Sequence, residues 1–291
     1  MSKVTKAVIL AAGLGTRMLP ATKSVPKELF PIVDKPALQY IVEELVESGI
    51  KHIMIIISRG KTLIEDHFDI SPELEEKLRN GGDKKKAILE EVQRISNLAD
   101  IVYARQKEML GTGHALFSAR EFTGNDPFVV CFGDDVIIND YPVSKQLIDA
   151  YEKYGKGVAG VQAVTREQVQ MYCTLKVDHI ADNHFNLSDM IEKPKPEQIL
   201  SLYSILGRMV LPAEIYDILD KTPLHNGEIY LTDAMKELAQ TKGMIAVDFF
   251  GNRYDMGNKL GVMQAQVEMA LKHKEIGEDF RAYLKEFAKT L

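Results

Sequence analysis

The sequence predicts an α/β protein built on a mixed, mostly parallel central sheet with helices on both faces. Strand-like and helix-like segments alternate through the first half of the chain, which is the pattern of right-handed βαβ crossovers. The strand-like segments there are short runs of β-branched and other apolar residues, as in parallel strands covered on both faces. The first run ends abruptly in Gly13-Leu-Gly15, and a glycine turn after a buried strand is typical of Rossmann-like sheets.

The length, net charge and cysteine count are those of an ordinary globular protein and limit the kinds of partner that it can bind. The 291 residues admit one large α/β domain or two smaller ones, and the lack of a repeat or low-complexity linker favours one. The net charge of −6 argues against non-specific nucleic-acid binding. The two cysteines, without a C-x-x-C spacing, indicate no disulfide framework, and no apolar run approaches the ~18 residues of a membrane span. We expect a cytoplasmic enzyme without nucleic-acid or membrane partners.

The elements of the first half follow from apolar runs and amphipathic stretches. Strands are expected at 6–10, 52–57, 101–103 and 128–132, and helices at 37–48, 61–68, 85–96, 114–121 and 143–154. In such a sheet, ligands bind outside the carboxyl ends of the strands. Gly13 and Asp134 each follow a predicted strand, so both should face one crevice.

The second half is less regular and should extend the same sheet. Strands are expected at 158–164, 174–177, 184–191, 204–211 and 244–249, and helices at 214–219, 231–238 and 259–273. The tail 277–291 is amphipathic, with apolar residues at helical spacing: Phe280, Tyr283, Leu284, Phe287 and Leu291. This face could pack within the chain or against another subunit.

The most informative stretch is the glycine turn and the cations that follow it. Backbone N–H groups in such a turn can face an anion, and Arg17 and Lys27 add positive charge, which together would hold a polyphosphate. The dinucleotide fingerprint is excluded because its third glycine position is Met18 and strand 53–57 ends in Ser58-Arg59 rather than an acid. A P-loop is absent as well. What remains, G-x-G-T-R followed by P-K-E, is the pattern of sugar nucleotidyltransferases.

Two aspartates are candidate ligands for Mg²⁺. Asp134 follows the apolar run 128–132 and Gly133, and Asp255 lies between a strand and Gly257 just before a helix. Mg²⁺ prefers few carboxylates, several waters and the oxygens of a substrate phosphate. The alternatives are that Asp134 caps the next segment or closes an Asx turn and that Asp255 is a helix N-cap.

Two further segments are candidates for substrate contacts. Pro194 and Pro196 keep the chain extended, so Glu192 can accept from sugar hydroxyls and Lys193 can pair with a phosphate, although charges beside prolines are often only surface. The glycines of 106–114 permit a close backbone approach to a base, with Gln106 reading its edge, unless the segment is a simple strand-to-helix loop. No G-x-S-x-G or H-E-x-x-H motif supports nucleophilic or zinc chemistry.

These motifs together resemble the bacterial UTP–glucose-1-phosphate uridylyltransferases over roughly residues 6–273. The strings that carry the resemblance are 13–23 (GLGTRMLPATK), 26–28 (PKE), 32–41 (IVDKPALQYI), 191–194 (IEKP), 227–233 (GEIYLTD) and 254–257 (YDMG). The resemblance implies the nucleotidyltransferase fold as a single domain. A nucleotide-binding half would span about 1–140, a sugar-phosphate-binding half about 141–273, and a C-terminal helix 274–291.

The resemblance also implies roles for individual residues. The nucleotide would be bound by Ala12, Gly13, Gly15, Thr16, Glu28, Gln106 and Gly111. Arg17, Lys27, Asp134 and Lys193 would carry catalysis, and Asp134 and Asp255 would bind Mg²⁺. The sugar phosphate would be bound by Glu192, Lys193, Gly207 and the backbone at Cys173.

The reaction implied is in-line attack of glucose 1-phosphate on the α-phosphorus of UTP, giving UDP-glucose and pyrophosphate without a covalent intermediate. The alternatives are a thymidylyl- or other sugar-1-phosphate nucleotidyltransferase and a catalytically weak regulatory paralogue. Three positions depart from the family's usual residues: Cys173 replaces glycine, Thr112 leucine and Tyr230 glutamine. We expect altered acceptor affinity from these changes. The family resemblance further suggests a homodimer or homotetramer.

Overall fold

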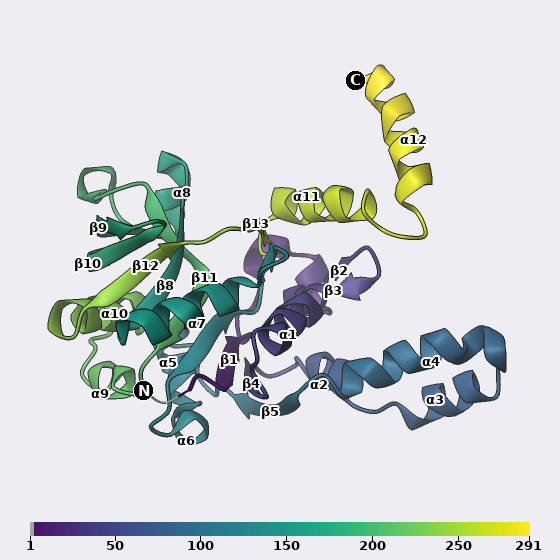
Figure 1. Cartoon of the computed structure of the whole chain (residues 1–291), viewed down its shortest axis with the longest axis horizontal. Coiled ribbons are helices and arrows are strands. Elements are labelled where there is room, and N and C mark those ends of the chain that lie inside the picture. Colours follow the sequence, from purple (N-terminus) through teal and green to yellow (C-terminus); the bar gives the residue numbers. More distant parts are fainter. Residues whose placement is uncertain (1–2) are drawn as a thin grey trace.

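A nine-stranded mixed sheet forms the centre of the described residues, 3–291 of the computed structural model (Figure 1). Within it, β10 and β11 run against the common direction of the other strands. The predicted fold class is therefore confirmed. The strand order is β5 (Asp100–Arg105), β4 (His52–Ile57), β1 (Lys6–Leu10), β6 (Phe128–Phe132), β11 (Tyr203–Leu211), β8 (Gly157–Ala163), β12 (Met244–Asp248), β10 (His184–Glu192) and β9 (Cys173–Ala181).

The parallel part of the sheet comes from the first half of the chain. β1 lies between β4 and β6, and Ala7 is in register with Ile53 on one side and Val129 on the other. All three residues are fully buried. Because apolar residues continue on both faces of these strands, each face can be covered by helices.

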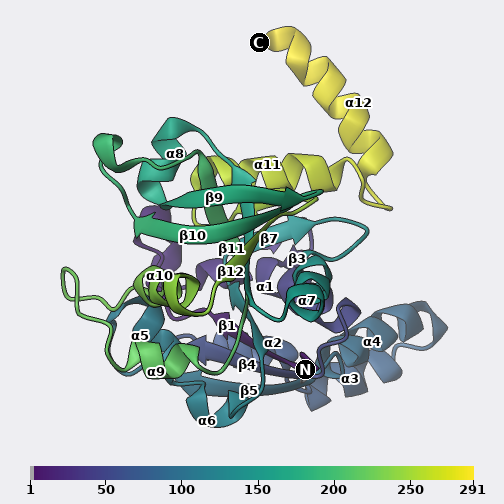
Figure 2. The same ribbon diagram turned by 60° about the vertical axis from the view of Figure 1, so that its left-hand side comes forward.

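Two layers of helices cover the sheet, as Figures 1 and 2 show. Ala7 and Ile9 of β1 belong to the core on one face, and Val8 belongs to the core on the other. The first core includes residues of α1 (Ala37–Glu47), α2 (Leu63–Phe68) and α7 (Val143–Tyr154). The second includes residues of α5 (Gly111–Phe117), α9 (Ile215–Leu219) and α10 (Leu231–Thr241). The alternation along β1 thus separates two apolar cores, one on each side of the sheet.

Several predicted helices differ in extent. The helix expected at 114–121 is two helices, α5 and α6 (Arg120–Thr123), and α5 begins three residues earlier, inside the predicted glycine loop. α2 begins at Leu63 rather than at 61. α3 (Pro72–Arg79) and α8 (Arg166–Met171) were not predicted, although Thr165 and Gln168 form a capping box at the start of α8.

A small two-stranded sheet beside the main one carries functional candidates. It pairs β13 (Asn252–Asp255) with β7 (Asp135–Ile138), so that Asp255 lies opposite Asp135. Neither strand was predicted from the sequence. A second short pair, β2 (Pro31–Ile32) and β3 (Lys35–Pro36), leads into α1. The sheet of β13 and β7 brings the 255 region to the end of β6.

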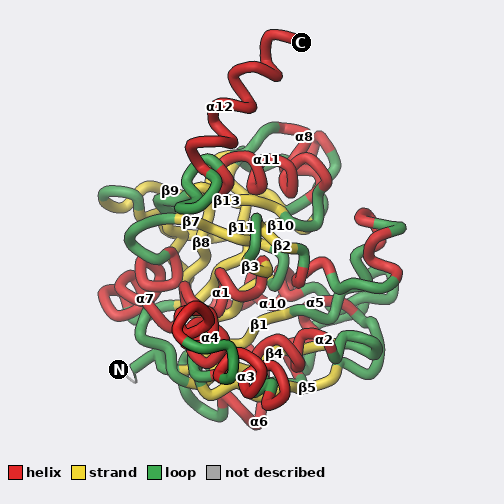
Figure 3. The backbone as a smooth tube through the Cα atoms, turned by 90° about the vertical axis from the view of Figure 1, so that its right-hand side faces the viewer, coloured by secondary structure: helices red, strands yellow, loops and turns green. Residues whose placement is uncertain are grey.

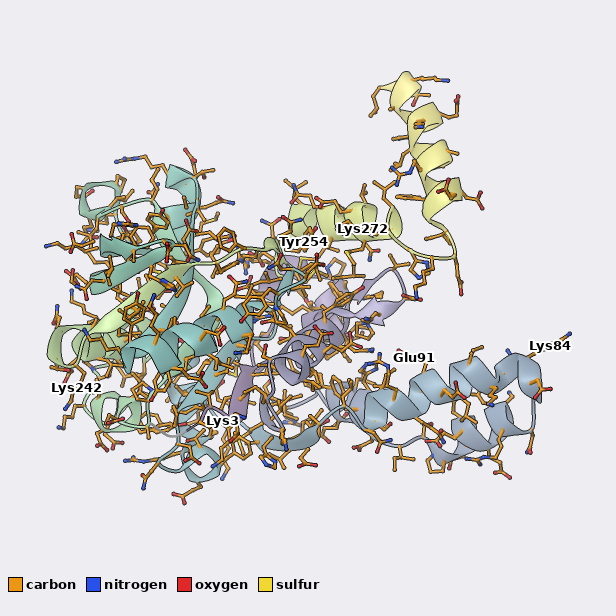
Figure 4. All side chains as sticks on the ribbon, viewed as in Figure 1. Lys3, Lys84, Glu91, Lys242, Tyr254 and Lys272 are labelled. Atoms are coloured by element: carbon orange, nitrogen blue, oxygen red, sulfur yellow. The ribbon has the colours of Figure 1, made fainter. Side chains whose placement is uncertain are left out.

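Two helical arms project from the body of the molecule. One is the hairpin of α3 and α4 (Asp83–Ser96), with Lys84 at its tip (Figure 4). The other starts at α11 (Lys259–Ala270), whose last turn is fixed to β13 by a 2.7 Å hydrogen bond from the Tyr254 hydroxyl to Glu268, and ends in α12 (Gly277–Phe287), which extends away from the body (Figure 3). No helix in the described part of the chain is long and apolar enough to cross a membrane.

Candidate active site

Two adjoining cavities lie at the carboxyl ends of β1, β6 and β10. The larger, of about 430 Å³, is lined by the glycine turn after β1, and the smaller, of about 190 Å³, is lined by residues of the small sheet and β9. Asp134 and Glu192 line both cavities. A substrate group bound in one cavity would therefore lie next to a group bound in the other.

Most of the predicted site residues line these cavities. The larger contains all the predicted nucleotide contacts together with two lysines: Ala12, Gly13, Gly15, Thr16, Lys27, Glu28, Gln106, Gly111 and Lys193. The smaller contains Arg17, Cys173 and Asp255. Gly207 lines neither cavity; a Cβ there would lie 2.5 Å from Asp135 Oδ2, so its backbone packs beneath that carboxylate. The roles of these residues remain predictions.

The glycine turn is held open toward the larger cavity. Gly15 has a φ of 66°, a left-handed conformation that favours glycine, and Thr22 Oγ1 donates to its carbonyl at 2.8 Å. At Gly13 an added Cβ would meet only Lys27 Nζ, at 3.9 Å. The space above Gly13 can thus receive a ligand beside the Lys27 ammonium.

Lys27 and Asp134 form an ion pair where the two cavities meet. Burial disfavours charge on both groups, but the opposite charge and the hydrogen bond outweigh it, raising the pKa of Lys27 and lowering the pKa of Asp134. Arg17 and Arg253 lower the pKa of Asp134 further. Both members of the pair therefore stay ionised at neutral pH, and a fixed positive charge faces the larger cavity.

Asp134, Asp255 and Arg17 converge on Gly257. A Cβ on Gly257 would lie 2.7 Å from Arg17 Nη2, 2.8 Å from Asp134 Oδ2 and 3.0 Å from Asp255 Oδ1. The N-cap alternative for Asp255 is wrong, because Asn258 caps α11 by accepting from the N–H of Leu260 at 2.8 Å. Among residues 3–291 no group of three or more His, Cys, Asp and Glu is placed to hold a metal.

Sequence reasoning missed the polar group behind these carboxylates. Arg253 Nε donates to Asp135 Oδ1 at 2.7 Å, its guanidinium lies over the Tyr172 ring, and the Tyr172 hydroxyl donates to Asp255 Oδ2 at 3.0 Å. Burial raises the pKa of Asp135 to about 6, opposed by Arg253. The alternation of side chains along a strand could have revealed Arg253, because it puts Arg253 on the same face as Asp255, two residues later.

Glu192, which lines both cavities, is held by a hydrogen bond, and Lys193, which lines the larger cavity, is held by its backbone. Thr232 Oγ1 donates to Glu192 Oε2 at 2.7 Å, and burial raises the pKa of Glu192. Lys193 has a φ of 43°, a strained conformation of the kind that clusters at functional sites, and its ammonium lies 5.4 Å from the centre of the Tyr230 ring. Lys193 N–H donates to the Tyr172 carbonyl at 2.8 Å, which keeps this segment against β9.

Cys173 is buried in the wall of the smaller cavity, and its polar atoms are already engaged. Its N–H donates to Ser204 Oγ at 3.2 Å, and its Sγ accepts from the N–H of Ile205 at 3.4 Å. Burial raises the pKa of the thiol to about 11, so the side chain is a neutral wall group rather than a nucleophile.

One side of the larger cavity, lined by Gln106 and Gly111, joins three segments. Gln106 Nε2 donates to the Gly111 carbonyl at 3.0 Å and lies 3.2 Å from His114 Nδ1. At Gly111, which has a φ of 89°, a Cβ would lie 2.8 Å from the Ile229 carbonyl. Only glycine fits this position, because the backbone here packs directly against Ile229.

The fold and this crevice together define a nucleotidyltransferase. A sequence profile of the nucleotidyl transferase family matches residues 6–271, and the chain belongs to that family. Within it, the chain is 48% identical over 288 residues to a UTP–glucose-1-phosphate uridylyltransferase of Bacillus subtilis, covering 99% of this chain and 96% of the relative. It is 46% identical to the enzyme of the same name from Staphylococcus epidermidis, covering 98% and 99% of the two chains. The resemblance found in the motifs is confirmed.

Solved structures agree with this assignment. The UTP-bound UGPase from Acinetobacter baumannii is 35% identical with a TM-score of 0.89, covering 97% of this chain and 99% of its own. A UDP-glucose pyrophosphorylase complexed with UDP-glucose is 36% identical with a TM-score of 0.85, covering 93% and 100%.

Proposed function

We propose that this protein transfers a uridylyl group from UTP to glucose 1-phosphate, forming UDP-glucose and pyrophosphate. The observation that carries the proposal is the shared wall of the two cavities: Asp134 and Glu192 line both, with the Lys27 ammonium on one side and Arg17 on the other. Relatives named for this activity match nearly the whole chain at 45–48% identity. In this arrangement a nucleoside triphosphate in the larger cavity would lie next to a sugar phosphate in the smaller one.

The larger cavity would hold UTP. Gln106, Glu28 and the backbone at Gly111 would contact the uridine. The N–H groups of the glycine turn would face the phosphates, as backbone donors do in other anion sites. Arg17 and Lys27 would add positive charge, and Asp134 raises the pKa of Lys27 despite its burial.

The smaller cavity would hold the glucosyl group, with its phosphate directed toward the larger one. Glu192 would accept from sugar hydroxyls, since Thr232 occupies only one of its lone pairs. Lys193, which lines the larger cavity, would pair with the phosphate of glucose 1-phosphate. The Cys173 side chain narrows the smaller cavity, so the affinity for glucose 1-phosphate should depend on the side chain at this position.

The transfer would be a single displacement. An oxygen of the glucose 1-phosphate dianion forms a bond to the α-phosphorus of UTP while the bond from that phosphorus to the bridging oxygen breaks, and pyrophosphate leaves. The residues contribute positioning and charge stabilisation, which are the main sources of catalysis in such transfers. Lys27, Arg17 and Lys193 would stabilise the negative charge on the reacting phosphates.

Mg²⁺ is the cofactor we propose, held by Asp134 and Asp255. The chemistry of this donor set fits the ion, because two carboxylates converging beside a phosphate site match its preference for few carboxylates, water and phosphate oxygens. When bound, Mg²⁺ would neutralise charge on the α-phosphate.

We also propose a homo-oligomer, a dimer or tetramer, assembled through α12. Tyr283 and Phe287 stack at 5.9 Å on an exposed face of this helix, and a free helix of its length is marginal in water. Antiparallel pairing of two copies would set the acidic first turn, Glu278 and Asp279, against Lys285 of the other copy. In light scattering, Tyr283→Asp should give monomers, whereas Ala282→Asp on the opposite face should not. Monomeric wild-type protein would refute this assembly.

A cytoplasmic location is part of the same proposal. Both cysteines, Cys131 and Cys173, are buried and unpaired, which suits a reducing compartment.

The activity is tested by offering glucose 1-phosphate with UTP and comparing wild type with Asp134→Asn. Wild type should form UDP-glucose, and the variant should lose turnover while still binding UTP and melting cooperatively. Retention of most activity by Asp134→Asn would exclude the role proposed for this carboxylate.

A further inference from the structure

Lys61 is a buried cation that lies outside every role assigned above. It sits on the loop between β4 and α2 and is 7% exposed. Its ammonium donates to Glu28 Oε1 and Oε2, both at 2.8 Å, and to the Ala11 carbonyl at 2.6 Å. An ammonium has three donor hydrogens, so all of them are used inside the protein.

The three groups joined by Lys61 belong to separate segments of the nucleotide wall. Ala11 lies between β1 and the glycine turn, Glu28 lies on the short 3₁₀ turn Lys27–Leu29, and Lys61 follows β4. Gly60, with a φ of 84°, lets the loop turn back toward the crevice. A single ammonium thus ties the phosphate side of the cavity to its base side.

Glu28 depends on this ammonium. The carboxylate is 1% exposed, and burying an unpaired carboxylate is costly. Lys27 is the other nearby cation, but its ammonium pairs with Asp134. Without Lys61, Glu28 would have to protonate or move, and in either case the wall it contributes to the cavity would change.

We infer that Lys61 is a positioning residue for the nucleotide, acting by fixing Glu28 and the start of the glycine turn. The inference rests on the proposed function to the extent that Glu28 faces the nucleotide. Lys61 itself does not touch the substrate, since its three hydrogens are directed to protein oxygens. Its effect should therefore appear in nucleotide affinity and be coupled to Glu28.

The test measures equilibrium UTP binding by calorimetry, without glucose 1-phosphate, for Lys61→Met, Glu28→Gln and the double variant. Lys61→Met should weaken binding at least tenfold. In the double variant the loss should be smaller than the product of the two single losses, because both substitutions disrupt one unit. The matched control is Lys51→Met. Lys51 is exposed and lies next to the amino end of β4, so this substitution should leave the UTP dissociation constant unchanged.

Turnover measurements separate positioning from general damage. Lys61→Met should raise the KM for UTP while the KM for glucose 1-phosphate stays within twofold of wild type. UTP binding within threefold of wild type, or single losses that multiply in the double variant, would overturn the inference. If Lys61→Met does not fold, the double variant, which buries no charge here, decides alone: UTP binding within threefold of Glu28→Gln supports the inference, and weaker binding contradicts it.

Different experimental results would refute the proposed function and this inference. Wild-type protein that binds UTP but forms no UDP-glucose would refute the activity, and the coupling between Lys61 and Glu28 would still be measurable by binding. Wild-type protein that forms UDP-glucose while Lys61→Met binds UTP normally would refute the inference alone.

Discussion

Glu44→Ala is expected to destabilise the protein strongly, because it breaks a buried ion pair that joins the two halves of the chain. Glu44 on α1 accepts from Ser144 of α7, at 2.9 Å from the N–H and 2.6 Å from Oγ. It also accepts from Arg208 of β11, at 2.7 Å from Nη2 to Oε2. Arg208 is 0% exposed, so removing Glu44 leaves a buried guanidinium without a counter-charge. Such a loss costs about 3–5 kcal/mol.

The loss of stability in Glu44→Ala can be measured in two assays. The free energy of unfolding in urea should fall by about 3–5 kcal/mol, and the midpoint of thermal unfolding should fall by roughly 6–20 °C. Glu47→Ala, an exposed position on the same helix, should stay within about 0.5 kcal/mol of wild type. Because the pair bridges both halves, unfolding should remain a single transition, as expected for one domain.

A double variant tests whether the unpaired buried guanidinium causes the loss of stability. Glu44→Met with Arg208→Met removes both charges and keeps apolar volume, so it should recover most of the lost stability. A loss of less than about 1 kcal/mol in Glu44→Ala, which is the scale of an exposed ion pair, would refute the reasoning. So would a double variant no more stable than Glu44→Ala.

Three further outcomes follow from the site. Gly257→Ala should abolish turnover in the UDP-glucose assay, because the added methyl would lie 2.7 Å from Arg17 Nη2 and 2.8 Å from Asp134 Oδ2; normal activity would contradict the convergence on Gly257. Burial raises the pKa of Glu192, helped by Asp233 and Glu228 and opposed by Thr232 and Lys193, so its carboxylate is lost as pH falls through this raised value. The KM for glucose 1-phosphate should then increase as pH falls, and a KM with the same pH dependence in Glu192→Gln would assign the effect elsewhere. Offered in place of UTP, dTTP should be a poor donor in initial-rate assays, and equal turnover would exclude a uridylyl-specific site.

The sheet and the glycine turn after β1 were predictable because both depend on local sequence. The apolar runs at 6–10, 52–57 and 128–132 have no competing periodicity, and their observed bounds match those predicted. Gly13 and Asp134 then line one cavity because parallel strands end at one edge. This rule needs no knowledge of side-chain packing.

The residues that the sequence did not reveal depend on contacts between distant segments. The strands carrying Arg253 and Asp135 span four residues each and include charged side chains, so no apolar alternation marks them. Lys61 was placed in the helix predicted at 61–68, but α2 begins at Leu63. That difference of two residues leaves Lys61 on the loop, from which its ammonium reaches Glu28. Helix ends are set by such tertiary contacts as well as by propensity.

Two glycines form a different element from the one that the sequence predicts. The sequence predicts a loop at Gly111 and Gly113, yet they begin α5, since the segment at 229 packs too closely for a side chain at either position. A helix that opens with glycines has low intrinsic propensity, so only the packing against Ile229 explains it.

The central claim is tested most directly by following one reaction with ³¹P nuclear magnetic resonance: purified protein, Mg²⁺, UTP and glucose 1-phosphate. The account predicts that UTP and glucose 1-phosphate disappear together while UDP-glucose and pyrophosphate appear in equal amounts, and that EDTA stops the reaction. Protein that binds UTP but forms no UDP-glucose, or that releases pyrophosphate without it, would contradict the account.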